Sequence, residues 1–84
     1  MILEIFFKNR NFGVLILKDE QKTIDTLAFE FDRNLETQLI SGLDKILNKN
    51  KMPLSSLKRV RILGKVRKDS LSYQIAQAFK KALG

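Results

Sequence analysis

Apolar residues with two different periods divide the chain into strands and helices. Apolar runs over 2–7 and 14–17, and an alternation of apolar and polar residues over 23–31, predict three strands joined by short polar turns. Such short connections favour an antiparallel meander. The first run is almost continuously apolar, which is typical of a strand covered on both faces.

Apolar residues at helical spacing begin after residue 34. Asn34 is the expected N-cap of a first helix, and Pro53 cannot continue it, so we expect the helix to end within 48–51. Residues 60–64 predict a fourth strand, parallel to the first because a helix crosses between them. The apolar stripe of the first helix consists of Leu35, Leu39, Leu43, Ile46 and Leu47, widened by Ile40.

A second helix is expected after the loop 65–68. Asp69 or Ser70 is its predicted N-cap, and Lys80 and Lys81 lie in its last turn, where cations suit the helix dipole. The predicted fold is therefore one α/β domain over 1–84, with the order β-β-β-α-β-α and a mixed four-stranded sheet. The core stripe expected for this helix consists of Leu71, Ile75, Ala78, Phe79 and Ala82.

The composition excludes several kinds of chemistry. The chain has no Cys and no His, which removes disulfides, thiol nucleophiles, imidazole bases and the usual zinc sites. No apolar run approaches the roughly 20 residues that span a bilayer. The start, residues 1–5, contains an acid and no basic region, so we expect no signal peptide and a cytoplasmic protein without a membrane partner.

Two sets of residues suggest catalysis only weakly. Glu4, Glu30 and Asp32 could form the carboxylate set of a two-metal nuclease, but Glu30 alternates with apolar residues and is expected to face solvent. Ser70 and Ser72 have no His or Cys to form a catalytic pair, so helix capping is the better interpretation. We expect no catalytic residue, no metal and no cofactor.

The most marked feature of charge is a basic segment, within a chain whose net charge is +7. No acid interrupts it before Asp69, and Tyr73 is the only aromatic residue near it. The segment could contact RNA phosphates, contact an acidic partner, keep the chain in solution, or protect the edge of the fourth strand from pairing. Its candidate RNA-contacting residues are Arg59, Arg61, Lys65, Arg67 and Lys68.

Two stretches carry a resemblance to a known family. Residues 39–47 are similar to the first helix, and residues 54–64 to the following turn and glycine-ended strand, of the N-terminal domain of the TsaB family, which acts in tRNA threonylcarbamoyladenosine biosynthesis. Gln74 falls on the arginine of the family motif. The resemblance spans effectively the whole chain and implies a ribonuclease H-like or actin-like ATPase half-domain.

The phosphate-binding loops of that family are replaced here. The glycine-rich loop before the second helix has become residues 67–72, and the polar segment after the first strand has become Phe6, Phe7 and Lys8. Such loops need glycine because it reaches positive φ at little cost. The resemblance therefore implies a truncated and degenerate relative that binds no nucleotide and is no enzyme.

The resemblance also implies a protein partner. In the family the first two helices pack against those of a second TsaB-like chain or of the catalytic TsaD subunit. We therefore expect a scaffold that supports a TsaD-like subunit or forms a homodimer, with tRNA as a second ligand. The alternative is a small basic module that binds RNA or tRNA independently. The expected protein-interface residues are Ile40, Leu47, Tyr73, Ala76 and Leu83.

Overall fold

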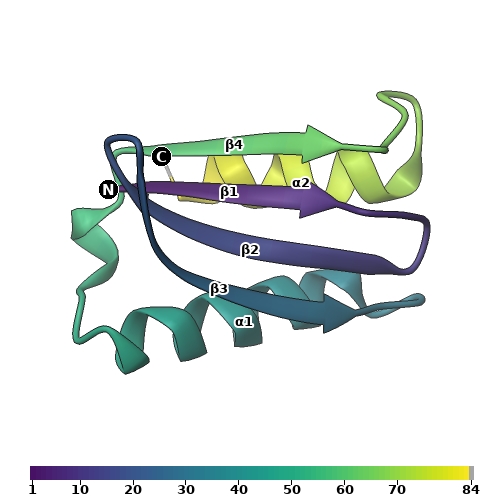
Figure 1. Ribbon diagram of the computed structural model, residues 1–84. Helices are drawn as coiled ribbons and strands as arrows, with labels where there is room; N and C mark the ends of the chain where they lie inside the picture. Colours follow the sequence, from purple (N-terminus) through teal and green to yellow (C-terminus); the bar gives the residue numbers. More distant parts are fainter. Residues whose placement is uncertain (84) are drawn as a thin grey trace.

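Four strands form a single mixed sheet in a computed structural model of the protein, which describes residues 1–83 (Figure 1). The sheet order is β3-β2-β1-β4, so β3 and β4 are its edges. The order of elements along the chain, β-β-β-α-β-α, is the predicted one. The elements are β1 (Ile2–Phe7), β2 (Phe12–Asp19), β3 (Lys22–Glu30), α1 (Leu35–Lys49), the 3-10 helix η1 (Leu54–Ser56), β4 (Arg59–Gly64) and α2 (Leu71–Ala82).

The pairing of the strands confirms the predicted topology. β1 lies in the middle of the sheet, antiparallel to β2, with Ile5 opposite Leu15, and parallel to β4, with Ile5 opposite Ile62. β2 pairs with β3 in an antiparallel register that shifts between Leu17 and Lys18. The parallel pair requires a crossover from one end of the sheet to the other, which β2, β3 and α1 supply together.

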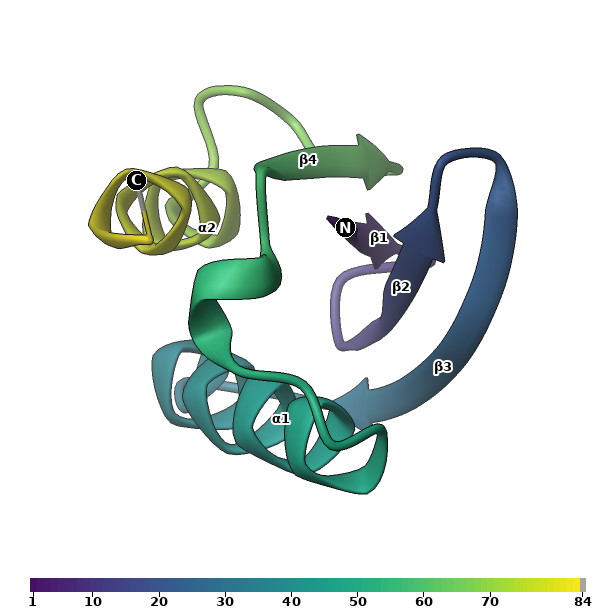
Figure 2. The same cartoon turned by 90° about the vertical axis from the view of Figure 1, so that its left-hand side faces the viewer.

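Both helices cover the same face of the sheet, and Figure 2 shows them on one side of the curved strands. Alternate residues of the strands point to this side, among them Leu3 and Ile5 of β1 and Leu15 of β2, all completely buried. The opposite face of the sheet is covered by no element of residues 1–83. The prediction that β1 is covered on both faces is therefore wrong for this chain by itself.

The first helix follows its predicted pattern except at its N-terminus. The five main residues of the predicted stripe of α1 are buried, whereas Ile40, which was expected to widen it, is exposed. The helix ends at Lys49, as expected. Asn34 lies at the N-cap position, but its side chain makes no capping hydrogen bond. Its Oδ1 instead accepts a 3.0 Å hydrogen bond from the backbone N–H of Asp32, which stabilises the turn that enters the helix.

The second helix is rotated relative to the predicted core stripe. Ser70 caps it as predicted, since its Oγ accepts a hydrogen bond from the backbone N–H of Tyr73. However, Ala76 is completely buried, whereas Leu71 is 71% exposed. Phe79 of the predicted stripe is buried as expected, but the other buried residue, Ala76, lies one residue, about 100°, from Ile75 of that stripe. The small side chain of Ala76 lets α2 approach the sheet closely, while Ile75, Ala78 and Ala82 of the predicted stripe line a groove beside it.

Candidate interaction surfaces

The rotation of α2 produces an apolar groove between the two helices. Ile40 on α1 and Leu54 on η1 are 55% and 51% exposed at its rim, while Phe79 lies at its base. The groove encloses about 660 Å³ and carries two acids, Glu36 and Asp44, on the α1 side. Exposed aliphatic side chains that converge on one groove are the usual mark of a helix-binding surface. The remaining lining residues are Leu43, Leu47, Ile75, Ala78, Ala82 and Leu83.

Three of the five predicted interface residues line this groove. Ile40 is freely exposed there, Leu83 is half-buried, and Leu47 contributes only the small part of its side chain that reaches the surface. Tyr73 lies elsewhere, beside Lys68 in a small hollow on another side of α2. Ala76 belongs to the core and cannot form a surface, which corrects its assignment to an interface.

The basic segment runs along the exposed edge of the sheet and into the loop after it. Its candidate RNA-contacting residues all lie at the surface, and β4 is an edge strand, so its charges are in a position to hinder pairing with another strand. Two of its cations are already paired with acids. Arg67 contacts Asp69 through two hydrogen bonds of 3.1 Å, and Arg61 contacts Glu4.

Glu4 is the one buried charged residue among the described residues, and it lies on the face without helices. Its carboxylate oxygens lie 3.2 Å from Lys18 Nζ and 3.6 Å from Arg61 Nη1, so one acid joins three neighbouring strands, β2, β1 and β4. Neither Glu30 nor Asp32 takes part. Glu30 is exposed, as its alternation predicts.

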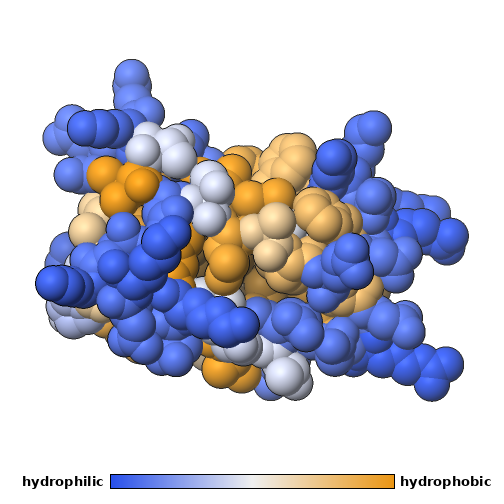
Figure 3. All heavy atoms as spheres, turned by 60° about the horizontal axis from the view of Figure 1, so that its bottom comes forward, coloured by the Kyte–Doolittle hydropathy of each residue, from blue (hydrophilic) through white to orange (hydrophobic). Residues whose placement is uncertain are grey.

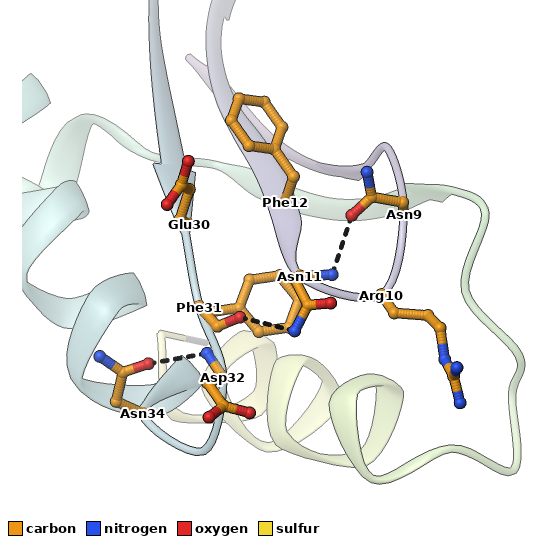
Figure 4. Close-up of a pocket in the computed structure, with 8 residues that line it drawn as sticks. All are labelled: Asn9, Arg10, Asn11, Phe12, Glu30, Phe31, Asp32 and Asn34. Atoms are coloured by element: carbon orange, nitrogen blue, oxygen red, sulfur yellow. Dashed lines mark hydrogen bonds between the residues drawn. The ribbon is translucent and has the colours of Figure 1, made fainter.

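The acids of the nuclease interpretation do not converge. Glu30 and Asp32 line a polar hollow at the end of β3, next to the turn between β1 and β2 (Figure 4). Within it, Asn11 Nδ2 donates a 3.2 Å hydrogen bond to the carbonyl oxygen of Phe31. Residues 1–83 contain no group of three or more acids that could hold a metal ion. No helix among them is long and apolar enough to cross a membrane.

A further surface, the helix-free face of the sheet, has no counterpart in the sequence patterns. Its residues come from all four strands, and the pairing places Phe6 beside Val14 and Leu63 on this face. Phe12 lies two residues before Val14 and points to the same side. Phe6 is far from the basic segment in the sequence, so a search along the chain misses that it lies one aligned row from Arg61. We call this surface the open face.

Comparisons with known proteins add no family to these observations. No model of a protein family matches the chain, and a search of curated proteins finds no match for it.

Proposed function

We propose that this protein is a non-catalytic scaffold that binds a protein partner through the groove between α1 and α2. The observation that carries the proposal is the pair of exposed aliphatic side chains, Ile40 and Leu54, at the rim of a groove whose base is apolar. Exposing two large aliphatic residues on one groove is unfavourable in water, and a helix laid into the groove removes both from water.

The resemblance to the TsaB family suggests which protein the partner is. We propose a TsaD-like catalytic subunit, which the scaffold supports in the cytoplasm during N6-threonylcarbamoyl modification of adenosine in tRNA. A second copy of this chain is the other candidate for the groove. The chain itself then supplies a surface rather than a reaction, in keeping with the replacement of glycine-rich phosphate loops by residues 67–72.

Complex formation with the cognate TsaD-like protein tests this proposal. Light scattering of the purified chain, alone and mixed with that protein at tens of micromolar, measures whether a complex or a homodimer forms. The variant Ile40→Glu places a charge at the groove and is expected to abolish the complex. Thr37→Glu is the matched control, because Thr37 is exposed on the same helix and does not line the groove.

Three results would contradict the scaffold. One is the absence of any complex or dimer in this concentration range. Another is equal loss of binding in Ile40→Glu and Thr37→Glu, because it would assign the effect to charge rather than to the groove. A third is turnover of nucleotide by the chain alone.

A second candidate function, binding of RNA or tRNA, is favoured by the exposed basic segment and the net charge of +7. Cations that neutralise phosphates release counterions, so affinity for tRNA should fall steeply as salt rises. Replacing Arg59, Arg61, Arg67 and Lys68 with Gln should remove most of this affinity. Absent or salt-insensitive binding would exclude this candidate.

A further inference from the structure

The open face combines an apolar centre with a basic side. Across the middle of the sheet, the register aligns Leu63, Phe6, Val14 and Ala28, one from each strand. The next aligned row contains Arg61 of β4 and Ile16 of β2, with Glu4 between them. Figure 3, which brings the side with α1 and β3 forward, shows hydrophobic side chains gathered near the centre with hydrophilic side chains around them.

Two aromatic rings on this face, on adjacent strands, are close neighbours. Phe6 on β1 pairs with Val14, and Phe12 lies two residues from Val14 along β2, so the two are diagonal neighbours, about 7–8 Å apart by sheet geometry. Both side chains are half-buried and keep part of their surface in water. An extended single strand of nucleic acid can lay neighbouring bases on rings at such a spacing, because every base has a π-face.

Four cations and two acids, Glu4 and Glu30, lie around the two rings. Lys8 Nζ lies 5.7 Å from the centre of the Phe12 ring, and Glu30 of β3 lies opposite Phe12. On the other side of Phe6, Arg61 lies in the next aligned row, and Arg59 and Lys18 lie in the row after that. The carboxylate of Glu4 is only 5% exposed and is already engaged by two of these cations, so the accessible charge near Phe6 is positive. A polyanion that also stacks fits both the charge and the rings.

Other occupants fit this face less well. A second copy would bring Arg59 and Lys18 against the same cations, and like charges repel across a contact. An acidic amphipathic helix would match the charge but has no particular need for two rings at a diagonal spacing. The combination of rings and cations on a four-stranded sheet with helices on one side is instead typical of sheet platforms for single strands.

We propose that the open face binds single-stranded nucleic acid, with bases stacked on Phe6 and Phe12 and phosphates held by Lys8 and Arg59. This inference deepens the RNA-binding candidate described above. It adds a stacking surface to the basic segment, which alone provides only contacts to the backbone of the nucleic acid. It also places the ligand on the side of the sheet opposite the groove, so both surfaces can be occupied at once.

Fluorescence anisotropy with labelled 12-nucleotide oligouridylate and oligothymidylate tests the proposal, with a 12-base-pair RNA duplex and tRNA as comparison. The variants are Phe6→Leu and Phe12→Leu, which keep an apolar side chain but remove the ring. Each is expected to weaken single-strand binding roughly 5- to 150-fold, the range of one stacked base. The oligouridylate and oligothymidylate arms decide whether the ligand is RNA or DNA.

Two controls separate stacking from loss of folding. Leu71→Ala removes an exposed apolar side chain that lies on α2, away from the open face, and should leave binding unchanged. Phe6→Trp keeps a ring at this position and should keep the affinity that Phe6→Leu loses. Thermal unfolding followed by circular dichroism shows whether each variant is folded at the assay temperature.

The outcomes distinguish this inference from the wider RNA-binding candidate. If tRNA binding depends on salt and falls in the Gln variants but is unchanged in Phe6→Leu and Phe12→Leu, RNA binding stands and the stacking platform is overturned. Equal affinity for duplex and single strand would also overturn it. So would tighter binding of poly-glutamate than of either oligonucleotide, because that result would assign the face to an acidic protein.

Discussion

The side-chain amide of Asn50 donates a 2.9 Å hydrogen bond to Oδ2 of Asp25, which joins the end of α1 to β3. The same amide group also donates to the carbonyl oxygen of Ile46, so its position is fixed from two sides. The carboxylate of Asp25 further accepts a hydrogen bond from the backbone N–H of Thr26 and lies 3.4 Å from Lys49 Nζ. These contacts stabilise the charged form, and the hydrogen bond from Asn50 contributes most to lowering the pKa of Asp25.

The lowered pKa makes a prediction about acid stability. A carboxyl group whose pKa is lower in the folded state contributes stability above its unfolded pKa of about 3.9, and loses that contribution as the pH falls through the folded value. The free energy of unfolding of Asp25→Asn should therefore be lower than that of the wild type at pH 7, and the gap should close as the pH falls below about 3.9. Urea unfolding of both proteins between pH 7 and pH 2.5 measures this gap.

The exposed Asp19 provides the control for this comparison. Asp19→Asn should leave the dependence of stability on pH close to that of the wild type, because Asp19 lacks the partners of Asp25. A gap between Asp25→Asn and the wild type that stays constant down to pH 2.5 would contradict the assigned role of the ionised carboxylate.

Glu4 should prove more important for its charge than for its size. Glu4→Gln leaves Lys18 and Arg61 without their partner and should lower the free energy of unfolding by about 1–2 kcal/mol. This is less than the roughly 3–5 kcal/mol for a fully buried pair, because both cations reach water. Glu4→Leu should cost less than Glu4→Gln, since an apolar side chain needs no partner on this face. Chemical denaturation of both variants measures these losses of stability. A larger loss in Glu4→Leu than in Glu4→Gln would contradict the prediction.

Two glycines should respond differently to replacement by Ala. Gly64 has φ of +93° and its missing Cβ would collide with the backbone of Phe7, so Gly64→Ala should destabilise the protein by about 2 kcal/mol or more. A Cβ on Gly42 in α1 would approach Cδ1 of Leu15 at 2.9 Å and Cδ2 of Leu27 at 3.3 Å, both at the ends of flexible side chains. The better helix propensity of Ala, worth about 1 kcal/mol, offsets part of that strain. Thermal denaturation compares the two variants. Equal losses of stability would contradict the different surroundings assigned to the two glycines.

The rotation of α2 can be tested at two of its positions. Ala76→Leu inserts a large side chain between helix and sheet and should cost about 1–3 kcal/mol, whereas Leu71→Ala should change stability by less than about 0.5 kcal/mol. Urea unfolding of the two variants measures both effects. The predicted stripe would give the opposite order, with Leu71 as the core residue, so the comparison separates the two orientations of the helix.

Local patterns were sufficient for the elements and their order. The alternation at Leu27 and Phe29, the helical spacing of Leu35 and Leu39, and the stop at Pro53 each report a preference that acts over a few residues. These preferences predict the strands, the helices and the parallel pairing of β1 with β4, because a crossover leaves few other arrangements. The helix cap at Ser70 could also be predicted from the sequence, since its hydroxyl reaches a backbone N–H within the same turn.

The sequence by itself determined the strands, the helices, their order and the excess of positive charge. The tertiary structure alone decided that Ala76 rather than Leu71 faces the sheet, that Glu4 lies between Lys18 and Arg61, and that Phe6 and Phe12 share a face with Arg59. The physical reason is that these relationships depend on how closely helices and strands approach one another. The spacing of apolar residues along the chain shows that a helix has an apolar stripe. How closely the helix packs against the sheet decides which residues of that stripe are buried.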